Sequence, residues 1–160
     1  MASPYETLRA ELPKAPQTWL LTGVAGFIGS NFVLDWLAAS HETVVNLDKL
    51  TYAGNLHNLA AVAGDPRHVF VHGDFGDTAL VNSLLATHQP RAVLNFAAES
   101  HVDRSIHGPG DFIHTNIVGT FNLLECVRAY WVALAAPEQA GFRFLHVSTD
   151  EVYGSLGKSD

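Results

Sequence analysis

Cysteine, positive charge and long apolar runs are all scarce in this sequence, and each scarcity excludes a class of protein. The single cysteine, Cys126, cannot form a disulfide within the chain, which favours a reducing compartment such as the cytoplasm. Lysine and arginine total 9 against 16 aspartates and glutamates, a net charge of −7, so no nucleic-acid-binding face is expected. No apolar run reaches the roughly 20 residues of a membrane span, and residues 1–16 lack a signal peptide's apolar core.

The chain does contain enough apolar material for one folded domain. It has 160 residues, of which 48% are hydrophobic and 16% charged. Residues 1–16, with three prolines, are interpreted as an N-terminal extension, and the fold is expected within residues 17–160. The 9 histidines are scattered without the spacing of metal ligands, so no metal site is predicted.

Short apolar segments alternate with helical patterns along residues 17–160. Strands are predicted at 18–22, 43–47, 69–72, 92–96 and 142–147, and helices at 27–39, 77–86 and 111–134. This alternation predicts an α/β fold of the Rossmann type, an incomplete doubly wound parallel sheet of about five strands with helices on both faces. The apolar residues expected to face the core are Phe27, Ile28, Phe32, Leu34, Trp36 and Leu37 in the first helix, and Ile113, Ile117, Phe121, Leu124, Val127 and Trp131 in the long one.

Three glycines follow the first predicted strand with the spacing G-x-x-G-x-x-G. Gly23, Gly26 and Gly29 stand where a tight turn, close approach of a pyrophosphate and close helix–strand packing each require glycine. The N-terminus of the following helix would face the negative charge. A plain turn would also explain the glycines, but Asp48 follows Gly29 by 19 positions, at the end of the second strand. There it could accept hydrogen bonds from the adenosine ribose and repel a 2′-phosphate, which favours NAD, or it could simply cap a loop.

Other strand ends also carry candidate ligand contacts, because ligands of such sheets lie beyond the carboxyl ends of the strands. Asp74 follows the third strand and could hold an adenine amino group or cap the next helix. After the fifth strand, Asp150 and Glu151 are adjacent carboxylates, and differing burial can separate the pKa values of such a pair into an acid and a base. A helix-capping role is the alternative for this pair.

Five segments together resemble the dTDP-glucose 4,6-dehydratases of the extended short-chain dehydrogenase/reductase superfamily. These segments are residues 22–29, 48–55, 97–105, 115–116 and 148–154, and the resemblance covers about residues 17–155. The glycine loop indicates only the superfamily, whereas Asp-Lys-Leu-Thr-Tyr-Ala-Gly-Asn, Ala-Ala-Glu-Ser-His-Val-Asp-Arg-Ser and Thr-Asp-Glu-Val-Tyr-Gly are specific to the dehydratases.

The resemblance implies a reaction on tightly held NAD with the nucleotide sugar dTDP-glucose as substrate. The sugar C4 hydroxyl is oxidised, water is eliminated across C5–C6, and a hydride returns to C6. Asp150 would be the acid, Glu151 the base, Thr149 a catalytic and substrate contact, and Ser100 a substrate contact. The implied cofactor contacts are Gly23, Gly26, Phe27, Ile28, Gly29, Asp48, Lys49, Leu50, Thr51, Asp74, Phe75, Phe96, Ala97, Ala98, Ser100 and Thr115.

The sequence departs from the family pattern near its C-terminus. Family members are longer and carry a Tyr-x-x-x-Lys pair and a nucleotide-sugar domain after this point, whereas Tyr153 and Lys158 here are five positions apart. We therefore expect a partial NAD-binding domain that does not turn over alone. The resemblance also implies that the long helix at 111–134 pairs with a second subunit, so a homodimer is expected for the full-length enzyme. The alternatives are a nucleotide-sugar epimerase or decarboxylase, which needs no acid/base carboxylate pair for elimination, and a non-catalytic NAD-binding module.

Overall fold

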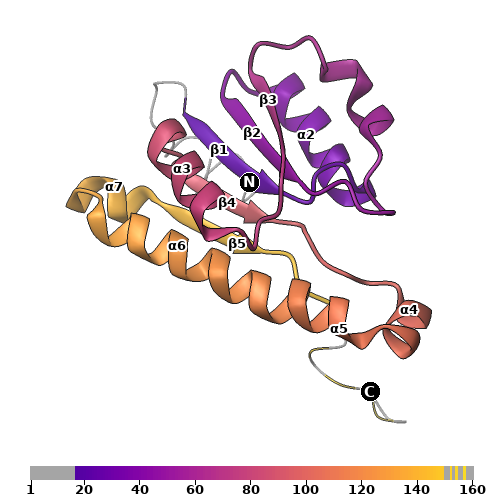
Figure 1. Ribbon diagram of the computed structural model, residues 1–160. Coiled ribbons are helices and arrows are strands. Elements are labelled where there is room, and N and C mark those ends of the chain that lie inside the picture. Colours follow the sequence, from indigo (N-terminus) through magenta and orange to yellow (C-terminus); the bar gives the residue numbers. More distant parts are fainter. Residues whose placement is uncertain (1–16, 150–151, 153, 155–156, 158–160) are drawn as a thin grey trace.

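The computed structural model describes residues 17–149, 152, 154 and 157 (Figure 1). Within these residues one parallel sheet has the strand order β3-β2-β1-β4-β5. Its strands are β1 (Thr18–Thr22), β2 (Thr43–Asp48), β3 (His68–His72), β4 (Ala92–Asn95) and β5 (Arg143–His146). The order confirms the doubly wound Rossmann-type sheet, and it reverses between β1 and β4, where such folds place their ligand. The expected extension at residues 1–16 and the predicted acid and base, Asp150 and Glu151, lie outside the described residues.

Helices cover both faces of the sheet, as Figure 1 shows. On one face, α3 (Thr78–His88) and α6 (Thr120–Ala133) pack over a core that includes Leu20 and Leu123. On the other face, α2 (Phe27–Ala39) and the 3₁₀ helix η1 (Leu56–Val62) pack over a core that includes Leu21 and Val33. Leu20 and Leu21 belong to opposite cores because successive side chains of a strand point to opposite faces.

The predicted boundaries are close to the observed ones where the sequence signals are local. Strand β1 and helix α2 have the predicted bounds, β2, β3 and β4 differ by one residue at one end, and β5 is one residue shorter at each end. Helix α3 begins at Thr78 because the Asp77 carboxylate accepts hydrogen bonds from the amides of Ala79 and Leu80, at 3.0 and 3.1 Å. Asp77 is therefore the N-cap.

The predicted long helix is one continuous run with three geometries. It comprises α5 (Pro109–Phe112), a π-helical segment η2 (Ile113–Gly119) and α6. Two short helices, α4 (Val102–His107) and α7 (Ala136–Gly141), and the 3₁₀ helix η1 were not predicted. Over residues 17–149, none of the helices combines the length and the apolar character that a bilayer crossing requires.

The predicted buried stripes are wrong in part. Phe27 and Ile28 are 82% and 61% exposed, because the first turn of α2 lines an open cavity at the carboxyl ends of the strands. In α2 the buried side chains include Val33 and Leu37.

In the long helix the exposed and buried faces are reversed for most of the predicted residues. Leu123, Cys126 and Val127 are buried, which agrees with an interior position for the cysteine. The predicted core residues Ile113, Ile117, Phe121, Leu124 and Trp131 are 40–63% exposed. The helix has two apolar stripes, and only the one that packs on α3 and the sheet is covered.

Candidate functional site

The glycine loop between β1 and α2 is held in a conformation that needs glycine at two positions. Gly23 has φ of +71°, and a Cβ on it would lie 2.5 Å from the backbone N and Cα of Ala97. A Cβ on Gly29 would lie 2.7 Å from the Cα of Val24. Helix α2 then begins at Phe27 without a side-chain cap, so an anion can approach its first amides.

Asp48 holds two loops together at the end of β2. Its Oδ2 accepts a hydrogen bond from the Ala25 amide at 2.8 Å, and its Oδ1 accepts one from the Leu50 amide at 2.7 Å. The carboxylate is only 8% exposed. It therefore does cap its own loop, and because each carboxylate oxygen has a second acceptor site, it keeps capacity for ribose hydroxyls as well.

Asp74, after β3, is ion-paired with Lys49, after β2. The Lys49 Nζ lies 2.6 Å from Oδ2 of Asp74, and the Gly76 amide donates to Oδ1 at 2.8 Å. Partial burial alone would raise the pKa of Asp74, but the bonds from Lys49 and Gly76 outweigh it and hold the pKa below its ordinary value of 3.8. Asp74 does not cap α3, since Asp77 does.

These loops enclose a cavity of about 380 Å³ at the carboxyl ends of the strands. Every predicted cofactor contact lines this cavity except Leu50. The Leu50 amide donates to Asp48, and its backbone has φ of +54°. The lining residues that sequence reasoning missed are Leu47, Ala53, Gly54, Gly73 and Glu99. They belong to the same strand ends and loops as the predicted ones, so their position along the chain was the available signal. Gly54 also packs tightly, because a Cβ there would lie 3.2 Å from Oδ1 of Asp48.

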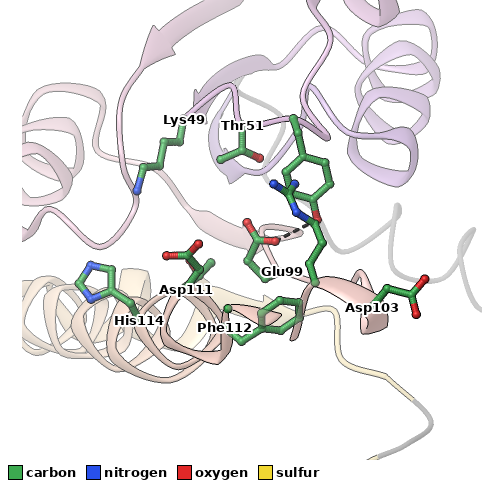
Figure 2. Close-up of a pocket in the computed structure, with 11 residues that line it drawn as sticks. Lys49, Thr51, Glu99, Asp103, Asp111, Phe112 and His114 are labelled. Atoms are coloured by element: carbon green, nitrogen blue, oxygen red, sulfur yellow. Dashed lines mark hydrogen bonds between the residues drawn. The ribbon is translucent and has the colours of Figure 1, made fainter. Parts of the chain in front are cut away.

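A second cavity, of about 610 Å³ (Figure 2), adjoins the first and shares Lys49, Thr51, Glu99 and Thr115 with it. The Tyr52 hydroxyl donates to Oε2 of Glu99 at 2.9 Å, and the Arg104 guanidinium lies 3.7 Å from the centre of the Tyr52 ring. Burial and the neighbouring Glu99 raise the pKa of Tyr52, and Arg104 opposes them. Arg104 thus contacts the Tyr52 ring at the border of this cavity.

The backbone of Glu99 is held in place by the side chain of Asn116. Its amide donates to Oδ1 of Asn116 at 2.8 Å, and Nδ2 of Asn116 donates to its carbonyl at the same distance. These two hydrogen bonds tie the segment after β4 to the π-helical segment η2. Glu99, which lines both cavities, is therefore held through its side chain by Tyr52 and through its backbone by Asn116.

The predicted substrate contacts lie at two places. Ser100 is exposed and lines the 380 Å³ cavity. Thr149 is exposed just after β5 and lines neither cavity. Among residues 17–149 and the three described residues beyond them, no group of three His, Cys, Asp or Glu side chains is placed to hold a metal ion.

Comparison with known proteins gives a consistent family assignment. A family model described as GDP-mannose 4,6 dehydratase matches residues 20–160. A dTDP-glucose 4,6-dehydratase of Xanthomonas campestris pv. campestris is 66% identical over 142 residues, which are 89% of this chain and 40% of that protein. The enzyme of the same name from Neisseria meningitidis serogroup B is 55% identical over 141 residues, with 88% and 40% covered. The chain spans about 40% of the length of these relatives.

Solved structures show the same fold. The crystal structure of dTDP-glucose 4,6-dehydratase from Bacillus anthracis in complex with NAD has a TM-score of 0.75 at 39% identity, covering 90% of this chain and 41% of that one. The corresponding enzyme from Streptomyces venezuelae, with NAD and TYD bound, has a TM-score of 0.75 at 48% identity, covering 88% and 42%. A UDP-glucose 4-epimerase from Thermotoga maritima, with UDP-glucose, scores 0.70 at 30% identity, covering 88% and 41%.

Proposed function

Because the chain belongs to the GDP-mannose 4,6-dehydratase family, we propose that it is the cofactor-binding part of an NAD-dependent dTDP-glucose 4,6-dehydratase. The observation that carries the proposal is the 380 Å³ cavity, which gathers the glycine loop, Asp48 and Ala97 at the point where the strand order reverses. The residues fit NAD: Gly23 and Gly29 let the loop pack closely on Ala97 and Val24, the first amides of α2 carry no side-chain cap and can face a pyrophosphate, and Asp48 offers acceptors to a ribose.

The proposed division of labour follows from the chemistry of elimination. NAD, when bound, would accept a hydride from the sugar C4 and later return it at C6. Oxidation of C4 to a ketone acidifies the neighbouring C5–H, so Glu151 as a carboxylate is a competent base. Hydroxide is a poor leaving group, so Asp150 must donate a proton to the C6 oxygen. Thr149 would bind the sugar near C4, and Ser100 would lie beside the sugar or the nicotinamide.

The proposal assigns residues 17–160 to the cofactor-binding domain and the nucleotide-sugar domain to the part of the relatives that this chain does not span. It places the enzyme in the cytoplasm, since the single cysteine is a buried free thiol.

The proposal also includes a homodimer of the full-length enzyme. Ile113, Ile117, Phe121 and Leu124 recur at helical spacing and are all exposed, so they form an apolar face along η2 and α6 that a second copy would cover. Tyr130 does not belong to this face, because its hydroxyl donates to the Pro90 carbonyl and its ring packs on Phe142.

Nucleotide binding is tested first, on the 160-residue chain. NAD and NADP are titrated while tryptophan fluorescence or heat is recorded. We expect NAD to bind more tightly than NADP, and Asp48→Ala to lose both affinity and discrimination. Asp35→Ala, which removes an exposed carboxylate of α2 outside the cavity, is the control and should behave as wild type. A folded chain that binds neither nucleotide would refute the proposal.

Turnover is tested on the enzyme at the full length of its relatives. Conversion of dTDP-glucose to the 4-keto-6-deoxy sugar is followed by the absorbance of the keto product in base. Asp150→Asn and Glu151→Gln should each still bind NAD and lose conversion. Release of a C4-epimerised sugar instead would support the second candidate, an epimerase, which the epimerase among the structural neighbours makes worth testing. NAD binding without any sugar conversion would indicate a non-catalytic module.

A further inference from the structure

The last residues of three neighbouring strands form a row of polar side chains across the sheet. Strands β1, β4 and β5 lie side by side (Figure 1), and their last residues, Thr22, Asn95 and His146, are paired in register. Thr22 and Asn95 are fully buried. The Thr22 hydroxyl donates to Oδ1 of Asn95, and Nδ2 of Asn95 lies 3.0 Å from Nδ1 of His146. Buried polar groups cost free energy unless they are paired, so Thr22 and Asn95 must be satisfied by their neighbours, and the exposed His146 ends the row.

The orientation of the Asn95 amide follows from a backbone contact. The Ala97 amide, which can only donate, lies 3.1 Å from Oδ1 of Asn95, so that atom is the carbonyl oxygen. The other atom, Nδ2, is then a donor, and its partner Nδ1 of His146 must accept. An imidazole that accepts at Nδ1 is neutral and carries its proton on Nε2. The geometry therefore selects one tautomer of His146.

This row joins the three segments to which the proposed function assigns the cofactor and the sugar. Gly23 follows Thr22 and packs closely against the backbone of Ala97. The Ala97 amide in turn donates a hydrogen bond to the side-chain oxygen of Asn95. On the other side, the Val147 amide, two residues before Thr149, donates to the main-chain carbonyl of Asn95 at 3.0 Å. Asn95 is thus bonded to the strand that leads into the glycine loop, to the segment after β4 and to the strand that leads to the sugar contact.

We propose that Asn95 and His146 are positioning residues, which set the cofactor cavity relative to Thr149 through a row that requires His146 as the neutral Nε2–H tautomer. Asn95 acts on the cavity through its carbonyl oxygen and on β5 through its amide. The part of this inference that concerns NAD and the sugar rests on the proposed function. The tautomer and its dependence on Asn95 do not rest on it.

The tautomer is tested by nitrogen NMR of the whole chain labelled with ¹⁵N-histidine, near neutral pH. The His146 signals are assigned by their loss in His146→Asn. We expect a bare Nδ1 and a protonated Nε2 in the wild type. Asn95→Asp replaces the donor amide by a second acceptor oxygen, so the proton of His146 should move to Nδ1. A wild-type proton on Nδ1, or signals that Asn95→Asp leaves unchanged, would overturn the proposal.

The link to the cofactor is tested by the NAD dissociation constant of Asn95→Leu. This variant removes the side-chain oxygen of Asn95 and the two hydrogen bonds that it accepts, from Thr22 and Ala97. We therefore expect NAD to bind about tenfold more weakly or worse. Asn46→Leu is the matched control: Asn46 is equally buried, its Nδ2 faces Nε2 of His68 on β3, and it lines neither cavity. It should bind NAD within about twofold of wild type, since no cavity contact is lost.

Two results of this experiment count against the positioning role. NAD binding by Asn95→Leu within about twofold of wild type would overturn it. Equal weakening in both asparagine variants would reduce Asn95 to a general stabilising residue and overturn the proposal. If Asn95→Leu does not fold, Asn95→Ala, which also removes the side-chain oxygen, takes its place in the titration, with weaker NAD binding again the expected result. If even the wild-type chain binds no NAD, the proposed function fails, and the tautomer experiment still decides whether the row exists.

Discussion

Replacement of Gly23 by alanine tests the geometry on which the candidate cofactor site depends. The residue has φ of +71°, in the left-handed region that residues with a Cβ avoid. The added Cβ would also lie 2.5 Å from Ala97 N and Cα and 2.8 Å from the Phe96 carbonyl carbon. These neighbours are backbone atoms of the segment after β4, so they cannot move aside by a side-chain rotation.

The free-energy costs of the left-handed backbone and of the close contact can each be approximated. The left-handed backbone costs about 1–2 kcal/mol for a residue with a Cβ, and overpacking a close contact costs about 1–3 kcal/mol more. We therefore expect Gly23→Ala to lower the free energy of unfolding by about 2–5 kcal/mol, a large part of the roughly 5–15 kcal/mol of an ordinary domain. The β1–α2 loop must also shift away from Ala97, so NAD binding should weaken with it.

The assay is urea unfolding followed by tryptophan fluorescence, with NAD titration of the folded protein. Gly64→Ala is the matched control, because a Cβ on Gly64 meets nothing within 4 Å and its φ is not in the left-handed region. Its unfolding free energy should change by less than about 0.5 kcal/mol. If the free energy of unfolding of Gly23→Ala lies within about 0.5 kcal/mol of that of Gly64→Ala, the argument from close approach is wrong.

Three further predictions test the packing and the charges. Leu123→Ala should lower the free energy of unfolding by about 2–5 kcal/mol, whereas Leu124→Ala, at a 43% exposed position, should cost less than about 1 kcal/mol; similar losses in urea unfolding would contradict the observed helix face. Asp77→Ala should cost about 0.5–2 kcal/mol in the same assay through loss of the α3 cap, and no loss would argue against capping. Lys49→Met should cost up to about 1 kcal/mol at neutral pH, because the ion pair is partly exposed. Since the pKa of Asp74 is lowered, its contribution is full above the ordinary value of 3.8 and disappears as the pH falls through the folded-state pKa; a difference between variant and wild type that persists in acid thermal melts would refute this.

Local signals explain why much of the fold was predictable. The bounds of β1 and α2 follow from an apolar run that ends at a glycine and from the helical pattern that begins after the glycine loop. The start of α3 follows from Asp77, whose side chain reaches amides only two and three residues away. The π-helical segment η2 was not predictable in this way. Its Gly119 lies against Phe75, where a Cβ would be 3.1 Å from the ring, and that contact joins residues far apart in the chain.

The sequence by itself determined the sheet, the glycine turn, the acidic residue at the end of β2 and the family resemblance, because each depends on residue types at short spacing. Only the tertiary structure decided which stripe of the long helix is covered, because periodicity identifies apolar faces and not what packs on them. Only the tertiary structure also decided that Asp48 bonds both Ala25 and Leu50, and that Asn95 joins the ends of β1 and β5. Such contacts arise from strand order and register, which place residues side by side that are distant along the chain.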